Sequence, residues 1–341
     1  MSIRMSRGSL VVALLLAALV EPSGARGGTP GPEENRSAVR RSLPLIARSA
    51  KEYTRHRDCF SCHHQAVPVF ALRLAKERGF AVDSSLIETQ LEQAEADLSS
   101  AAESYRKGEG QPGGVTRAGY ALWTLKAGGW ESDETTAAVV EFLLKHDEKR
   151  GYWHTTSNRP PSEASPFTST YLAIRGLVSF GLPDQKGRIT ARIGAAREWL
   201  LKEPARDNED RVFRLWGLEA AGATRDEVET AARALRDTQR PDGGWSQLDG
   251  QPSDAYATGS ALVSLHLAGR LATDDARYVR GLAYLETTQQ SDGSWHVRSR
   301  SKPFQTYFES GFPYKEDQFI SMAASSWATA AIALACPKPE S

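Results

Sequence analysis

Cysteine is scarce in this chain: three in 341 residues are too few for the disulfide framework of a small secreted domain. Net charge is also lacking, because 42 lysines and arginines balance 42 aspartates and glutamates. This balance argues against a nucleic-acid-binding protein that works by bulk charge, and against a polybasic membrane-binding surface. With 28 glycines and 17 prolines the chain is not of low complexity, and 40% hydrophobic residues suffice for a buried core.

Long hydrophobic runs are missing after the first 25 residues. Before that point, Arg4 and Arg7 precede an apolar run at 10–20 that is too short to span a bilayer, and small residues at 23–25 resemble a cleavage site. We predict that residues 1–25 are a cleaved signal peptide, with a retained membrane anchor as the alternative. Residues 26–35 are expected to be a flexible leader. The mature chain is then periplasmic or secreted, without a transmembrane helix.

An internal repeat runs through the rest of the chain. QRPDGGW (239–245) and QQSDGSW (289–295) share the pattern Q-x-x-D-G-x-W at a separation of 50 residues. Each lies between a charged segment and an apolar segment with helical spacing, so we expect an outer helix followed by a buried inner helix. A glycine closes the apolar segments at 119–129, 171–181, 213–222 and 260–269. Counting such pairs gives six, with approximate spans 36–80, 84–129, 132–182, 186–223, 225–270 and 274–336.

Six helical pairs predict an all-α fold, a closed (α/α)6 toroid that forms a single domain over 36–336, followed by a tail at 337–341. Closure would place the sixth pair beside the first. An open solenoid is the alternative. We prefer closure because neither end of the repeat region has an obvious polar capping repeat.

The repeated motif, with Arg-Gly at 280–281 in the helix before its second copy, resembles the QW repeats of squalene–hopene cyclases and their prenyltransferase-toroid relatives. The resemblance is strong in the last two repeats, weak at GYW (151–153), and covers nearly all of 36–336 at the level of fold. It implies the toroid and leaves the activity open. Trp245 and Trp295 are expected to pack between helices and stabilise the fold.

The resemblance also implies where a cyclase would carry its catalytic acid, the middle Asp of D-x-D-D-T-A at the start of an inner helix. The matching segment here is DAYATG (254–259), in which only Asp254 and Thr258 align. Tyr256 takes the place of the acid, and a phenol with a pKa near 10 cannot protonate an alkene. Asp254 and Tyr256 remain candidate catalytic residues. The zinc site of protein prenyltransferases is not expected, because its thiolate is missing.

A second motif points to different chemistry. Residues 59–63 read CFSCH, the attachment signature of c-type haem. Cys59 and Cys62 can bond the two vinyl groups, and His63 can hold the iron. The export signal agrees, because c-type haem is attached outside the bacterial cytoplasm. A redox-active cysteine pair, a zinc site that adds His64, and an inert segment are the alternatives.

The last outer-to-inner loop (296–318) is the longest and combines aromatic with charged residues. In a closed toroid it faces CFSCH, so His296 or Met322 is a candidate sixth ligand of the iron; a solvated histidine and a core methionine are the alternatives. Glu309 and Asp317 are candidate catalytic carboxylates, because aromatics with carboxylates can hold a cation, a sugar or a prenyl chain. A lid that plugs the toroid is the alternative.

Three hypotheses follow. The first is an exported toroid with one covalent haem, acting in electron transfer with a periplasmic redox partner. The second is a toroid enzyme that acts on an isoprenoid or a glycan in the rim funnel, and the third is a non-catalytic binding module. A nucleic-acid partner is expected for none of them.

Overall fold

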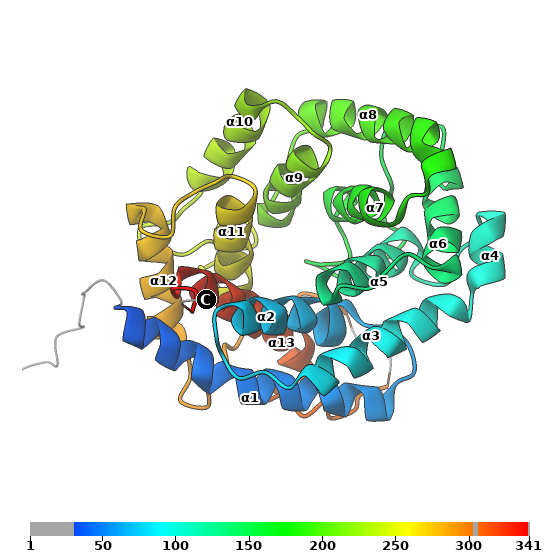
Figure 1. Cartoon of the computed structure of the whole chain (residues 1–341). Helices are drawn as coiled ribbons and strands as arrows, with labels where there is room; N and C mark the ends of the chain where they lie inside the picture. Colours follow the sequence, from blue (N-terminus) through cyan, green and yellow to red (C-terminus); the bar gives the residue numbers. More distant parts are fainter. Residues whose placement is uncertain (1–30, 303–305, 340–341) are drawn as a thin grey trace, which may run out of the picture.

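The computed structural model describes residues 31–302 and 306–339, so the predicted signal peptide lies outside the described residues. Within these ranges the chain is helical and has no β-strand. Its helices alternate between an outer and an inner ring (Figure 1). The outer helices are α1 (Pro32–His56), α3 (Ser84–Ser99), α4 (Ala102–Lys107), α6 (Glu134–Lys145), α8 (Lys186–Lys202), α10 (Arg225–Arg236) and α12 (Ala276–Thr288). The inner helices are α2 (Val67–Glu77), α5 (Gly114–Gly128), α7 (Pro166–Phe180), α9 (Asn208–Ala220), α11 (Ala255–Leu267) and α13 (Gln318–Ala335).

Composition decides which ring a helix joins. α10 is charged and buries only Ala231, Ala232 and Leu235, whereas α13 is built of small and apolar residues and buries all but three of its 18. Among the described residues, Lys315–Ala335 is the one helical segment long and apolar enough to cross a membrane. Because 89% of that stretch is buried inside the ring, its apolar character is explained by its inner position.

The ring is closed, as predicted. Gln239, after α10, donates from Nε2 to the carbonyl of Arg277 in the next outer helix at 2.8 Å. Gln289, after α12, makes the equivalent bond to the carbonyl of Ala38 in α1 at 2.9 Å. The repeat motif thus joins the last outer helix to the first by the contact that it uses between consecutive repeats. Side chains of Ser42 in α1 and Thr329 in α13 complete the junction at 2.7 Å.

The tryptophans of the repeats hold helices together. Trp245 and Trp295 are buried, and each donates its indole N–H to a carbonyl ten residues earlier, Leu235 at 3.0 Å and Leu285 at 2.7 Å. Trp153, in the weak third copy, makes the same bond to Leu143 at 2.8 Å. This geometry agrees with a packing role.

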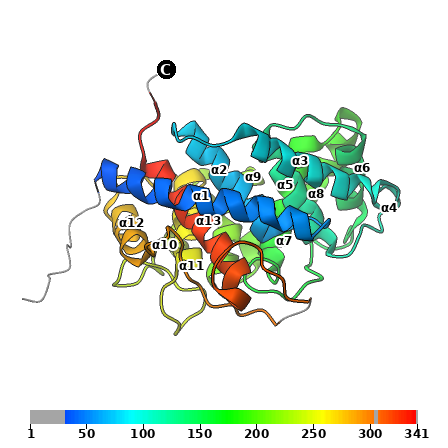
Figure 2. The same cartoon turned by 90° about the horizontal axis from the view of Figure 1, so that it is seen from below.

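Aromatic side chains from five inner helices fill the middle of the ring. Their ring centroids lie 4.8–6.3 Å apart, so they form one continuous cluster across the axis. The members are Phe70, Trp123, Tyr171, Trp216 and Trp327. The toroid is therefore not an open tube, and ligands must enter from the rims. The loops that precede α11 and α13 lie on one rim, opposite the C-terminus (Figure 2).

Two details differ from expectation. The leader was expected to extend to residue 35, but α1 begins at Pro32, because proline at the first turn with Glu33 and Glu34 behind it favours helix initiation. The second outer segment is divided into α3 and α4 by a break at residues 100–101. α4 then ends at Gly108, whose φ of 86° is the left-handed conformation that terminates helices.

Candidate functional site

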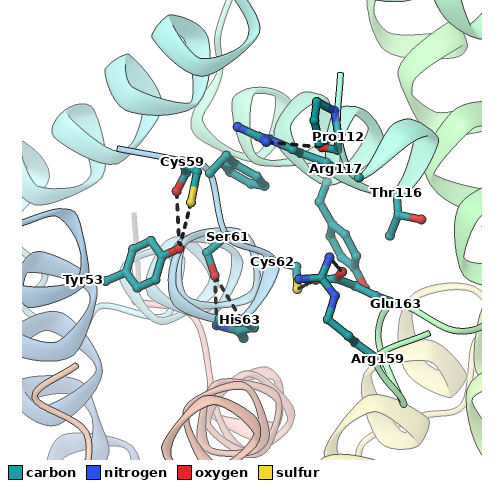
Figure 3. A pocket seen from close by; sticks show the side chains of 13 residues that line it. Tyr53, Cys59, Ser61, Cys62, His63, Pro112, Thr116, Arg117, Arg159 and Glu163 are labelled. Atoms are coloured by element: carbon teal, nitrogen blue, oxygen red, sulfur yellow. Dashed lines mark hydrogen bonds and ion pairs between the residues drawn. The ribbon is translucent and has the colours of Figure 1, made fainter. Parts of the chain in front are cut away.

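The CFSCH segment opens the first inner helix and borders a cavity at the rim. The cavity has a volume of about 220 Å³ and lies between α1, the start of α5 and the loop that precedes α7 (Figure 3). It is lined by Tyr53, Cys59, Phe60, Ser61, Cys62, His63, Pro112, Gly113, Thr116, Arg117, Tyr120, Arg159 and Glu163. Cys62–Ala66 forms a single π-helical turn that leads into α2. Such turns are frequent at functional sites.

Asp97 of α3 anchors this segment. Its carboxylate accepts the backbone N–H of Phe60 at 3.2 Å and pairs with Arg117 of α5, whose Nε donates at 3.0 Å. Gln111 donates to the same carboxylate at 3.1 Å. The side chain of Asp97 is almost fully buried, and these donors fix the segment between α3 and α5.

The two cysteines face different neighbours. Cys59 is exposed, and its sulfur lies 3.6 Å from the hydroxyl of Tyr53. Cys62 is buried and donates its S–H to Oε1 of Glu163 at 3.1 Å. Burial, and then the charge of Glu163, raise the pKa of the Cys62 thiol well above its usual range. Figure 3 shows the two side chains on opposite sides of Ser61, and neither is in a disulfide.

Two adjacent histidines, His63 and His64, stand at the end of the CFSCH segment. Nδ1 of His63 lies 2.9 Å from the Ser61 hydroxyl and 2.8 Å from Nδ1 of His64. Burial, with Arg159 nearby, lowers the pKa of His63 to about 3. His64 is fully buried, stacks on Tyr53 at 5.0 Å, and its Nε2 has no hydrogen-bond partner among the described residues. Both rings are therefore neutral at physiological pH.

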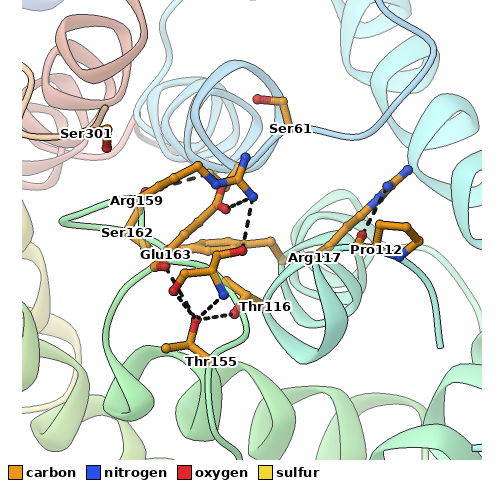
Figure 4. Close-up of polar contacts among 12 residues, drawn as sticks. Ser61, Pro112, Thr116, Arg117, Thr155, Arg159, Ser162, Glu163 and Ser301 are labelled. Atoms are coloured by element: carbon orange, nitrogen blue, oxygen red, sulfur yellow. Dashed lines mark hydrogen bonds and ion pairs between the residues drawn. The ribbon is translucent and has the colours of Figure 1, made fainter. Parts of the chain in front are cut away.

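The opposite wall of the cavity comes from the loop before α7. Arg159 and Glu163 form an ion pair, and their backbones bond to each other across the loop (Figure 4). Ser301 of the long last loop donates to the carbonyl of Pro160 at 3.0 Å. The wall is therefore braced by a segment that lies far away in the sequence.

These positions discriminate between the alternatives for CFSCH. Zinc needs about four donors around one point, but among the described residues the His, Cys, Asp and Glu donors of this segment form no such group. A redox disulfide needs two facing thiols, which is not the arrangement found. A c-type haem needs two thiols and a neighbouring imidazole at one cavity. Cys59, Cys62 and His63 all line the same cavity.

The donor set fits a c-type haem in identity and placement, and Arg117 and Arg159, each paired with a carboxylate, also line the cavity. The volume of about 220 Å³ is below the roughly 300–1,000 Å³ of ordinary ligand sites. Attachment of a haem therefore requires the walls to open beyond this conformation.

The long last loop lies beside the segment, as closure requires. Arg57 donates to the carbonyl of Thr306 at 3.3 Å, and the rings of His63 and Phe319 lie 4.9 Å apart. His296 is exposed and pairs with Asp317 at 2.8 Å, while Met322 is fully buried. Neither His296 nor Met322 lines the cavity of CFSCH, so their role as a sixth ligand stays a prediction.

The two carboxylates predicted in this loop have different surroundings. Asp317 accepts the N–H of Ser299 at 2.7 Å as well as His296, and so holds the loop to the start of α13. Glu309 accepts the hydroxyl of Tyr307 and lines a groove of about 460 Å³ beside Arg41 and Arg48 of α1. The structure does not bring Glu309 and Asp317 into one cavity.

Asp254 and Tyr256 lie at the start of α11. Asp254 caps the helix by accepting the N–H of Ala257 at 2.9 Å, and burial raises its pKa to about 6. The hydroxyl of Tyr256 donates to Glu209 of α9 at 3.2 Å. Burial, and then Asp207, raise the pKa of Glu209 to about 8, so a neutral carboxyl stands beside the position of the missing cyclase acid. Sequence reasoning missed Glu209, because only the fold brings α9 against α11.

Comparisons with known proteins agree with this architecture. Residues 211–329 match the family model of the squalene-hopene cyclase C-terminal domain. Drimenyl diphosphate synthase of Streptomyces showdoensis is 32% identical over 145 residues, which are 40% of this chain and 26% of the synthase. The chain thus spans about a quarter of the curated relative that it matches.

Solved structures extend the similarity to most of the chain. The apo type II terpene cyclase MstE from Scytonema superposes with a TM-score of 0.53 at 14% identity, covering 89% of this chain and 98% of MstE. An MstE variant in complex with merosterolic acid A gives 0.54 at 13% identity over 89% and 98% of the two chains. The fold is therefore the all-α toroid of type II terpene cyclases, and residues 211–329 are similar in sequence to the squalene-hopene cyclase C-terminal domain.

Proposed function

We propose that this chain is an exported, cyclase-like toroid protein that carries one covalent c-type haem at CFSCH and acts in electron transfer. One observation carries the proposal: Cys59, Cys62 and His63 line one rim cavity, and both thiols are unpaired. The missing cyclase acid at Tyr256 favours a function other than triterpene cyclisation.

Each residue of the site has a definite part. Cys59 and Cys62 would hold the haem through thioether bonds, and His63 would hold the iron. Bound in this way, the haem would supply a one-electron carrier. Ser61, at 2.9 Å from Nδ1 of His63, orients the imidazole. Phe319 packs on His63, and Tyr53 covers His64, so both side chains keep water from the histidine pair.

The test is a reduced pyridine-haemochrome spectrum of purified protein, produced in cells that attach c-type haem. The proposal predicts a c-type α band that survives acid extraction of free haem. The double variant Cys59→Ser/Cys62→Ser should lose it, and Cys336→Ser should keep it, because Cys336 is a free buried cysteine outside the motif. A wild-type protein without the band would overturn the proposal.

A second function is favoured by Glu209. Its neutral carboxyl is buried beside Tyr256, at the level where the cyclase acid would act, and accepts the hydroxyl of Thr168 at 3.1 Å. An acid–base enzyme on an isoprenoid or a glycan would use this group as its proton donor. Turnover of polyprenyl or glycan substrates by the wild type, lost in Glu209→Gln, would support it. Turnover that is unaffected by this substitution would exclude Glu209 as the donor.

A further inference from the structure

A cluster of metal-binding side chains lies apart from the rim cavity, at the turn that follows α6. The ligand atoms of His146, Asp147 and His154 all lie within 4.8 Å of one another. Among the described residues this is the one group of three or more His, Cys, Asp or Glu side chains with that spacing. The haem proposal does not use any of them.

The turn is built to hold these side chains in place. α6 ends at Lys145, and Asp147 adopts a φ of 54°, which non-glycine residues rarely adopt outside Asn and Asp. The guanidinium of Arg192 in α8 donates to the carbonyls of His146 at 3.0 Å and Arg150 at 2.7 Å, and stacks on Trp153 at 4.0 Å. A distant helix thus fixes both ends of the turn.

The three side chains already lie against one another. Oδ2 of Asp147 lies 2.5 Å from Nδ1 of His154 and 3.7 Å from Nε2 of His146. The two imidazole rings stack at 5.5 Å with an interplanar angle of 16°. Nε2 of His146 is buried and has no hydrogen-bond partner in the described part of the chain. A donor atom removed from water without a partner is costly, and a metal ion would satisfy it.

The spacing suits a small divalent ion. Zinc binds imidazole nitrogen at roughly 2.0–2.1 Å and carboxylate oxygen at about 2.0–2.2 Å, so two donors on one tetrahedral ion lie about 3.3 Å apart. The observed separations of 2.5 and 3.7 Å bracket this value. Small side-chain rotations would therefore bring these donor atoms to the spacing that one zinc ion requires. Oδ1 of Asp147 pairs with Arg150 at 3.3 Å, and Oδ2 accepts the backbone N–H of His154 at 3.0 Å. Metal binding would replace the contact between Oδ2 and Nδ1 of His154.

We infer that His146, Asp147 and His154 form a binding site for a divalent transition metal of the zinc class. Two imidazoles and one carboxylate are the donors that zinc prefers, and three protein ligands leave a fourth position for water or a ligand. The ion would connect the end of α6 to the segment that carries Trp153. It would therefore stabilise the third repeat as well as create a reactive centre.

The test measures Zn²⁺ binding by calorimetry on metal-stripped mature protein that carries no polyhistidine tag. The wild type should bind one equivalent at this site, and its Tm should rise with Zn²⁺. Asp147→Asn should weaken binding at least tenfold without unfolding the protein, because Asn also tolerates the left-handed backbone. His154→Ala should have the same effect.

Two matched variants separate this site from others. His56→Ala removes an imidazole that pairs only with Glu52, at 3.2 Å, and should leave the affinity unchanged. The double variant Cys59→Ser/Cys62→Ser should also still bind one equivalent of Zn²⁺. The inference is overturned if the wild type binds no zinc, or if binding survives Asp147→Asn and His154→Ala.

Discussion

Replacement of Glu209 by glutamine tests the electrostatics of the toroid interior. The carboxyl of Glu209 is 3% exposed, and within the described part of the chain it bonds to the hydroxyls of Thr168 and Tyr256 and forms no ion pair. Burial, reinforced by Asp207, raises its pKa from 4.5 to about 8. Glutamine has the same shape, and both hydroxyls can accept its amide N–H. The substitution therefore removes the titration and little else.

The direction and size of the effect follow from proton linkage. Below pH 4.5 the carboxyl is protonated in both the folded and the unfolded chain. Between pH 4.5 and 8 only the unfolded chain ionises freely, so the wild type loses stability at roughly 1.4 kcal/mol per pH unit. From pH 5.5 to 7.5 the loss is therefore roughly 2–3 kcal/mol. Glu209→Gln should not show this loss. The free energy of unfolding of the variant, relative to the wild type, should therefore rise over this pH range and level off above pH 8.

The assay is urea unfolding of the wild type and the variant across pH 5–9, with circular dichroism as the readout. The difference between their free energies of unfolding cancels the titration of groups that do not interact with Glu209, including Asp254, whose pKa is raised to about 6. Glu219→Gln, on the exposed face of the same helix, is the matched control. A difference that is flat with pH would refute the burial of an uncompensated carboxyl at Glu209.

Three other substitutions probe the ring and the rim. Gly293→Ala should lower Tm by several degrees, because Gly293 has a φ of 89° and a Cβ would meet the carbonyl oxygen of Arg41 across the closure. Trp245→Phe should cost about 1–3 kcal/mol in chemical denaturation, because it removes the indole N–H bond to the carbonyl of Leu235 and shrinks a fully buried side chain. An unchanged midpoint would show that this contact does not stabilise the fold. Asp97→Asn should lower the free energy of unfolding by roughly 2–4 kcal/mol, because it breaks a mostly buried ion pair with Arg117. It should also speed hydrogen exchange at the N–H of Phe60, which Asp97 accepts. Unchanged exchange would show that Asp97 does not anchor CFSCH.

Much of the fold could be predicted because the repeat is local. In the motif at 239–245, Trp245 bonds to α10 before it and Gln239 bonds to α12, the next outer helix, so seven residues specify how consecutive repeats pack. Closure followed from the number of repeats. The break between α3 and α4 carried no comparable signal, since it is a departure from the repeat.

The site was only partly predictable, because its walls come from distant segments. CFSCH could be recognised, but the partner of Cys62 is Glu163, 101 residues further along the chain. Glu209 meets Tyr256 across 47 residues, between two inner helices. The His146–Asp147–His154 cluster is close in sequence, but its convergence depends on the left-handed backbone at Asp147 and on Arg192. Pattern and periodicity do not encode contacts of this kind.

The most direct test of the central proposal is an intact mass measured under denaturing conditions, on protein purified from cells competent for c-type haem attachment. The account predicts a chain that begins after Ala25 and carries the additional mass of one haem, which denaturant does not remove. The double variant Cys59→Ser/Cys62→Ser should lack this addition. A wild-type chain of unmodified mass, from cells that load a control cytochrome c, would contradict the account.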